Sequence, residues 1–243
     1  MRVWSVCVMS ACVLWAWGVA AQETKGPILY LTFDDAQGMT AKDASGNGRD
    51  ATVKTDAKGA VAEVADVWVK DGKKGGAMRF DGENVYLAVP PTGLDREDKP
   101  FTFEAWVNGE GVLAHNGDTD ASLARHWTVE FALGTRKFNY CVGKSQVKGQ
   151  VWDALEHQTK ISGWTHVAVT YDGEGELSFH LNGKRVGSVV WEEFVPCEAQ
   201  DQFAIGAWYH SQKWVGLFKG MMDEVKLYDY MRSPEEIAAD AAQ

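Results

Sequence analysis

Aromatic side chains are concentrated near the C-terminal end of this sequence. Residues 208–214 read Trp-Tyr-His-Ser-Gln-Lys-Trp, and a further tryptophan lies in a polar stretch upstream. Exposed aromatic rings present flat apolar faces to the C–H side of a sugar, while polar groups beside them bond its hydroxyls. The alternative is that these rings close the edges of the fold. The candidate ligand-binding residues are Trp152, Trp208, Tyr209, His210 and Trp214.

Oxygen-bearing side chains at four positions have the chemistry to bind calcium, which takes six or more oxygen ligands. Asp34 follows the first apolar segment, and Asp43 and Asn47 lie in the adjoining loop. Asp223 precedes the last apolar segment. If the first and last strands are neighbours, these side chains converge, and we expect a stabilising Ca²⁺ rather than a catalytic one. The alternative is that Asp34 and Asp223 cap turns and accept hydrogen bonds from backbone amides.

Signatures of catalysis are weak. A glycoside hydrolase needs two carboxylates flanking a cleft, and the best available pair is Asp153 with Glu156. The sequence contains no Gly-x-Ser-x-Gly motif and no phosphate-cradling glycine loop. Its histidines show no metal-ligand spacing, so zinc has no support. We expect His166 and His180 to be sheet histidines whose ring nitrogens have partners.

The segments that would position these residues are β-strands. Residues 101–107 alternate with period two, and residues 177–181 place three large apolar side chains on one face. Asn182 and Gly183 then give a strong two-residue hairpin signal, with the return strand at 184–190. Further strands are predicted at 28–33, 127–133, 137–142, 203–208 and 216–228, with 56–74 as an excursion from the sheets.

One helix is predicted, at the C-terminus. Ser233 is an N-cap, Pro234 occupies the first helical position, and Glu236 completes a capping box. Short strands separated by Gly, Asp and Asn indicate a sandwich. We predict an all-β, two-sheet antiparallel β-sandwich of jelly-roll type with a short C-terminal helix.

One set of segments carries a family resemblance: residues 31–34, 44–48, 75–82, 101–107, 163–173, 182–183 and 220–228. In the same order, these segments resemble those of laminin-G-like domains of the concanavalin A-like lectin/glucanase superfamily. The resemblance implies a concanavalin A-like jelly roll with Trp106 and Trp164 in its core. Family members often carry a structural calcium near the positions of Asp34 and Asp223. Because the shared segments are structural, they do not determine function.

The N-terminus predicts export. Residues 1–21 combine a basic start, an apolar run and small residues, which favours a cleaved secretory signal; an uncleaved anchor is the alternative. Residues 22–243 would then be one domain, secreted, periplasmic or at the cell surface, with no stable membrane span. Export permits a disulfide between Cys141 and Cys197, with two separate thiols as the alternative. The net charge of −10 disfavours nucleic acid as a partner.

Together these features favour a secreted, non-catalytic carbohydrate-binding module of lectin type, whose partner is a glycan. The first alternative is an extracellular protein-interaction or adhesion domain, because laminin-G-like domains also have this role. The second and weaker alternative is a glycoside hydrolase or lyase. Ca²⁺ is the cofactor to which the residues point.

Overall fold

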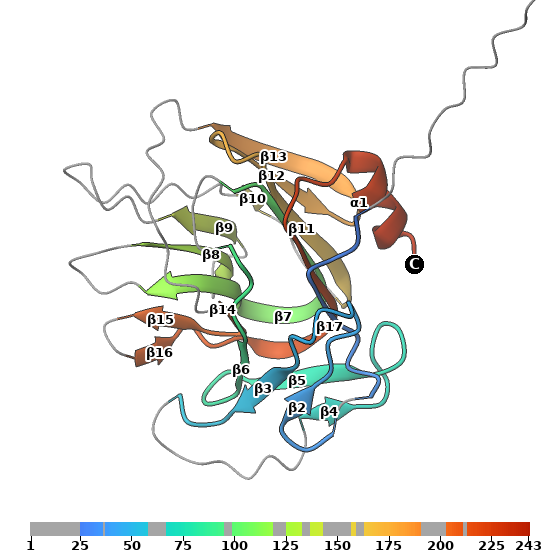
Figure 1. The fold of residues 1–243 in the computed structure, drawn as a ribbon, viewed down its shortest axis with the longest axis vertical. Coiled ribbons are helices and arrows are strands. Elements are labelled where there is room, and N and C mark those ends of the chain that lie inside the picture. The colour runs from blue at the N-terminus through green and yellow to red at the C-terminus, as the bar shows by residue number, and fades with distance from the viewer. Residues whose placement is uncertain are drawn as a thin grey trace, which may run out of the picture.

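The structure is a computed structural model that describes residues 25–35, 37–57, 67–94, 99–118, 125–132, 137–142, 157–158, 163–190, 203–210 and 213–243. These residues form a strongly curled, antiparallel β-architecture with a C-terminal helix (Figure 1). The elements are β1 (Leu29–Leu31), β2 (Thr40–Ala41), β3 (Ala51–Lys54), β4 (Trp68–Val69), β5 (Ala77–Asp81), β6 (Tyr86–Val89), β7 (Phe101–Asp118), β8 (Arg125–Ala132), β9 (Lys137–Val142), β10 (His157–Gln158), β11 (Thr165–Tyr171), β12 (Glu176–Leu181), β13 (Lys184–Val190), β14 (Phe203–Ile205), β15 (Trp208–His210), β16 (Lys213–Val215), β17 (Lys219–Tyr228) and α1 (Pro234–Ala241).

Two sheets share the long strand β7 (Figure 1). The first half of β7 pairs with β11 and β17, and its second half pairs with β8 and β14. The first sheet runs β13-β12-β11-β7-β17, with β1 and β5 on the other side of β17 and β4 beyond β5. The second sheet runs β10-β9-β8-β7-β14-β6-β3-β2. The predicted two-sheet antiparallel sandwich with one C-terminal helix is confirmed.

Glycines allow β7 to pass from one sheet into the other. Gly111 has φ +124°, and a Cβ on Gly109 would overlap the carbonyl oxygen of Lys219 in β17. Residues with side chains do not fit these positions without strain or displacement. The strand therefore continues to Asp118 instead of ending at Val107, where the sequence alternation predicted its end.

The hydrophobic core lies between the two sheets. Phe103 of β7 and Phe179 of β12 are fully buried on the inner face of the first sheet, and Leu87 of β6 is fully buried on that of the second. Phe80 and Phe218 meet edge to face, with ring centroids 5.6 Å apart. Each such side chain contributes roughly 1.5–3 kcal/mol by burial, so the core supplies the main stabilisation of the sandwich.

The outer face of the first sheet is polar and yet buried. Glu104, His166 and His180 come from three neighbouring strands, and each is at most 2% exposed. The register aligns Glu104 with Ala168 and Ala168 with His180, so these side chains lie on one face. The C-terminal helix α1 packs beside this sheet (Figure 1).

The start of α1 has the predicted capping box. The Glu236 N–H donates to Ser233 Oγ (3.2 Å), and the Ser233 N–H donates to Glu236 Oε2 (2.8 Å). The predicted hairpin turn is also confirmed, because Asn182 and Gly183 have φ of +48° and +76° and join β12 to β13. Local sequence chemistry thus determines both features.

Further local predictions differ from the structure. The predicted strand 203–208 is divided into β14 and β15, because Gly206 between them has φ +84° and its α-carbon packs against Phe80. The prediction that both histidine rings have partners was wrong: among the described residues, both ring nitrogens of His180 and Nδ1 of His166 lack a hydrogen-bond partner. Residues 1–21 lie outside the described residues. Within the described part of the chain, no helix combines the length and apolar character needed to cross a membrane.

Candidate ligand-binding face and predicted calcium ligands

The aromatic segment forms a short hairpin rather than an irregular loop. Strands β15 and β16 pair so that Trp208 lies opposite Val215, Tyr209 opposite Trp214, and His210 opposite Lys213. The hairpin projects beside β14 and β7 of the second sheet (Figure 1). Trp208, Tyr209 and Trp214 are each partly exposed. The structure therefore brings three of the predicted ligand-binding residues onto one small element.

Two glycines attach this hairpin to the second sheet. The Val112 N–H donates to the Gly216 carbonyl (2.9 Å), and the Gly206 N–H donates to the Leu113 carbonyl of β7 (3.1 Å). Both glycines have φ in the left-handed region, and a Cβ on Gly216 would lie 2.7 Å from Val112 Cγ2. Backbone hydrogen bonds at both ends, with no room for side chains, fix the hairpin against β7.

Trp214 is the centre of an aromatic cluster. Its ring centroid lies 4.3 Å from that of Tyr86 in β6 and 5.0 Å from that of Tyr209. Ala88 and Ala204, which have small side chains, pack in the same cluster beneath the rings. Tilted rings packed with small residues form a preordered platform, because little side-chain entropy remains to be lost when a ligand binds.

Tyr86 and Asp56 were missed by the sequence analysis. The Tyr86 hydroxyl donates to Asp56 Oδ1 (3.4 Å), and burial together with the Asp56 charge raises the pKa of the phenol. The phenol is therefore protonated at neutral pH. The available signal was the alternation in β6, where Leu87 and Val89 point into the core and Tyr86 must point outward.

Strand β3 adds polar groups to the same face. Thr52 pairs with Ala88, and Lys54 pairs with Tyr86, so both side chains lie on the side of the sheet that carries the aromatic cluster. Thr52 is exposed and Lys54 is partly exposed. We call Thr52, Lys54, Asp56 and Tyr86, with the hairpin residues Tyr209 and Trp214, the aromatic face; Trp208, which pairs with Val215, lies on the other side of the hairpin. The aromatic face combines apolar rings with hydrogen-bonding groups of both charges.

The other predicted ligand-binding residues are not placed by the structure. Trp152 lies outside the described residues, and the side chain of His210 is also outside them. Cys197 lies outside as well, so the disulfide with Cys141 stays a prediction.

Asp43 and Asn47 organise the loop that follows β1. Asp43 accepts hydrogen bonds from the N–H groups of Tyr30 (3.0 Å), Ser45 (2.9 Å) and Arg49 (2.9 Å) and from the Ser45 hydroxyl (2.9 Å). Burial alone would raise the pKa of Asp43, but these hydrogen bonds outweigh it and lower the pKa. The Asn47 side chain donates to carbonyls of Pro27 and Ile28.

Asp34 and Asp223 lie near each other in the fold, as expected for neighbouring first and last strands. β1 pairs with β17, and both carboxylates bind the loop 72–76. Among the residues described, however, no group of three or more Asp, Glu, His or Cys side chains is arranged to hold a metal ion. The oxygens of Asp34, Asp43 and Asp223 accept backbone hydrogen bonds instead. The predicted calcium site stays a prediction.

The antiparallel curled sandwich and its exposed aromatic hairpin define a protein of lectin-like architecture. Residues 81–238, more than half of the chain, match the family described as the concanavalin A-like lectin/glucanases superfamily (Laminin_G_3). The chain therefore belongs to this family, and the resemblance seen in the sequence is confirmed. No curated protein matches it in sequence.

Solved structures share the fold at low sequence identity. Domain 4 of AbnA, a GH43 extracellular arabinanase from Geobacillus stearothermophilus solved in complex with arabinotriose, aligns with a TM-score of 0.68 at 20% identity, over 90% of this chain and 98% of that domain. The binding domain of Paraclostridial Mosquitocidal Protein 1 gives 0.62 at 14% identity, over 89% of this chain. The botulinum neurotoxin serotype D binding domain gives 0.62 at 12%, also over 89%. This chain spans about half of each toxin domain.

Proposed function

We propose that this protein is a non-catalytic carbohydrate-binding module that holds a glycan on its aromatic face. The main observation is the partly exposed pair of Trp214 and Tyr209, which packs on the buried ring of Tyr86 and which the hairpin attachment fixes against the second sheet. Rings at this spacing would stack on sugar C–H faces, and Thr52, Lys54 and Asp56 beside them would bond hydroxyls.

The structural neighbours support binding rather than catalysis. The arabinanase domain was solved with an arabinose trisaccharide, and the toxin segments are binding domains. Arabino-oligosaccharides are therefore the first ligands to test, followed by other neutral oligosaccharides. The neighbouring domain belongs to an extracellular enzyme, which agrees with our proposal that this chain acts outside the cytoplasm, as a secreted, periplasmic or surface protein.

Calorimetric titration and glycan-array binding test the proposal. Trp214→Ala should weaken binding about five- to 150-fold, because a ring stacked on the sugar in such a site contributes about 1–3 kcal/mol. Trp208→Ala should weaken binding less, because Trp208 lies on the other side of the hairpin from Tyr209 and Trp214. Trp68→Phe is the matched control, because Trp68 is a partly buried tryptophan in β4 of the other sheet. An array without any binding, or equal affinity of the Trp214 variant, would contradict the proposal.

The second candidate function is binding of an extracellular protein, because two of the similar structures are toxin binding domains. A protein captured from the native envelope that stays bound in excess oligosaccharide, and that is lost in Trp214→Ala, would favour it. The weaker enzymatic candidate requires turnover of a polysaccharide that disappears in Asp153→Asn or Glu156→Gln.

A further inference from the structure

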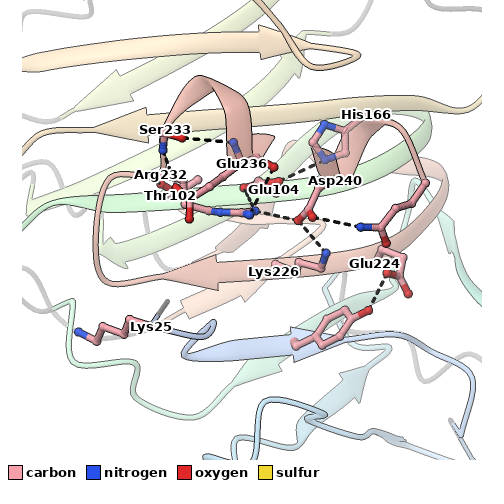
Figure 2. Close-up of polar contacts among 12 residues, drawn as sticks. Lys25, Thr102, Glu104, His166, Glu224, Lys226, Arg232, Ser233, Glu236 and Asp240 are labelled. Atoms are coloured by element: carbon pink, nitrogen blue, oxygen red, sulfur yellow. Dashed lines mark hydrogen bonds and ion pairs between the residues drawn. The ribbon is translucent and has the colours of Figure 1, made fainter. Parts of the chain in front are cut away.

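A buried charged cluster connects α1 to the outer face of the first sheet (Figure 2). Arg232 Nη1 lies 2.6 Å from Glu104 Oε1 of β7 and 2.7 Å from Asp240 Oδ2 of α1. Lys226 Nζ of β17 lies 2.9 Å from the same Asp240 oxygen. The helix is thus attached through ion pairs, whereas most of the sandwich is held by apolar packing.

The helix covers the strands that carry buried histidines. On one side it touches the β12–β13 turn, where a Cβ on Gly183 would lie 2.9 Å from Ala238 Cα. On the other side Asp240 reaches Lys226 of β17. The strands between these two contacts are β7 and β11. Ile237 of α1 is fully buried but belongs to neither apolar cluster, which indicates that it packs on the polar outer face.

His180 is the least satisfied group in this region. It is 2% exposed, and among the described residues neither ring nitrogen has a hydrogen-bond partner. The neighbouring His166 places Nε2 3.3 Å from Glu104 Oε2. Glu104 therefore binds Arg232 through Oε1, whereas its Oε2, beside His166, has no hydrogen-bond partner among the described residues.

We propose that α1 is an acid-sensitive latch, docked at neutral pH and released in mild acid when His180 becomes protonated. A neutral imidazole tolerates burial better than an imidazolium, which brings a full charge and a second N–H donor to a ring whose two nitrogens have no hydrogen-bond partner among the described residues. Releasing the helix admits water to the ring. Release would uncover the outer face of the first sheet, on the side of the sandwich opposite the aromatic face.

The surrounding charges agree with this direction. Burial, the Arg185 guanidinium and His166 lower the pKa of His180, while Glu104 acts against them. The pKa of His180 is therefore lower in the folded than in the unfolded protein. The contribution of neutral His180 to folding stability is complete above the unfolded pKa of 6.5, and it is lost as the pH falls through the folded pKa. The titratable and charged groups that face the cluster are Glu104, His166, Arg185, Lys226, Tyr228, Arg232, Glu236 and Asp240.

Amide hydrogen exchange at two pH values tests the latch. In the full chain, the protection factors of residues 234–241 should fall about tenfold or more between roughly pH 7.5 and pH 5, while those of β11 change little. In His180→Gln and His180→Leu the helix should keep its protection at both pH values. Ser233→Ala is the matched control, because losing the cap should lower protection equally at both pH values.

Three outcomes would overturn the latch. The first is equal helix protection at both pH values in the natural chain, and the second is an unchanged pH response in either His180 variant. If neither variant folds, an NMR titration of the natural chain decides, since the His180 ring and the α1 amides should change together. The third outcome that would overturn the latch is titration of the His180 ring without loss of protection in α1.

Discussion

Asp34 and Asp223, at opposite ends of the fold's sequence, bind the same loop. The Gly76 N–H donates to Asp34 Oδ1 (2.6 Å), and the Lys74 N–H donates to Asp223 Oδ2 (2.8 Å). A Cβ on Gly75 would overlap Asp34, and one on Gly72 would lie 2.8 Å from Asp223 Oδ2. The loop needs glycine here so that two carboxylates can approach its backbone.

The pH dependence of stability should report Asp223. Burial raises its pKa to about 6, the charge of Glu224 adds to this, and the amide hydrogen bonds oppose it. Between about pH 4 and 6 the folded state then holds a proton that the unfolded state lacks, so stability falls as the pH rises through this window. The contribution is up to about 3 kcal/mol.

Denaturant unfolding of the natural chain and of Asp223→Asn across this window measures that effect. The asparagine variant loses one amide acceptor at every pH but cannot titrate. Its deficit in unfolding free energy should therefore shrink as the pH rises from about 4 to about 7. A deficit that stays constant or grows would show that the Asp223 pKa is not raised.

Asp43→Asn should destabilise the protein by about 1–3 kcal/mol, because one of two oxygens that accept amide hydrogen bonds becomes an amide donor. Thermal unfolding in excess calcium and in EDTA checks this value. Equal losses in both buffers would assign Asp43 to loop capping. A loss seen only in calcium would support the predicted ion.

Gly216→Ala should displace the β15–β16 hairpin and weaken ligand binding. The new methyl group would lie 2.7 Å from Val112 Cγ2 at φ +61°, which costs about 1–3 kcal/mol in strain. Gly93→Ala is the matched control, because φ is +82° but no atom lies within 4 Å of the added Cβ. We expect the two variants to be destabilised to a comparable extent and ligand binding to be lost only in Gly216→Ala. Equal ligand binding by both variants would contradict the role of the hairpin attachment.

Arg232→Met should cost about 3–5 kcal/mol, because it leaves the buried Glu104 carboxylate without its guanidinium partner. Replacing both residues, as Glu104→Gln with Arg232→Met, should restore part of the loss. Chemical unfolding of the two single variants and the double variant gives the coupling energy. Additive losses would mean that the pair does not interact energetically.

Local chemistry in the sequence determined much of the fold. Alternation in β12, the Asn182–Gly183 turn and the Ser233 capping box each predict the observed element, because they depend on neighbours within a few residues. The aromatic segment 208–214 was recognisable for the same reason. Its conversion into a hairpin was not, because the anchoring partners Val112 and Leu113 lie in β7.

The sequence by itself therefore determined the strand pattern, the fold family and which residues carry suitable chemistry. Only the tertiary structure decided which of them meet. The period-two alternation shows which face of a sheet Tyr86 or Glu104 occupies. It does not show that Trp214 packs on Tyr86 or that Arg232 pairs with Glu104. Such contacts depend on how β7 passes between two sheets, and this is a property of the whole chain's packing.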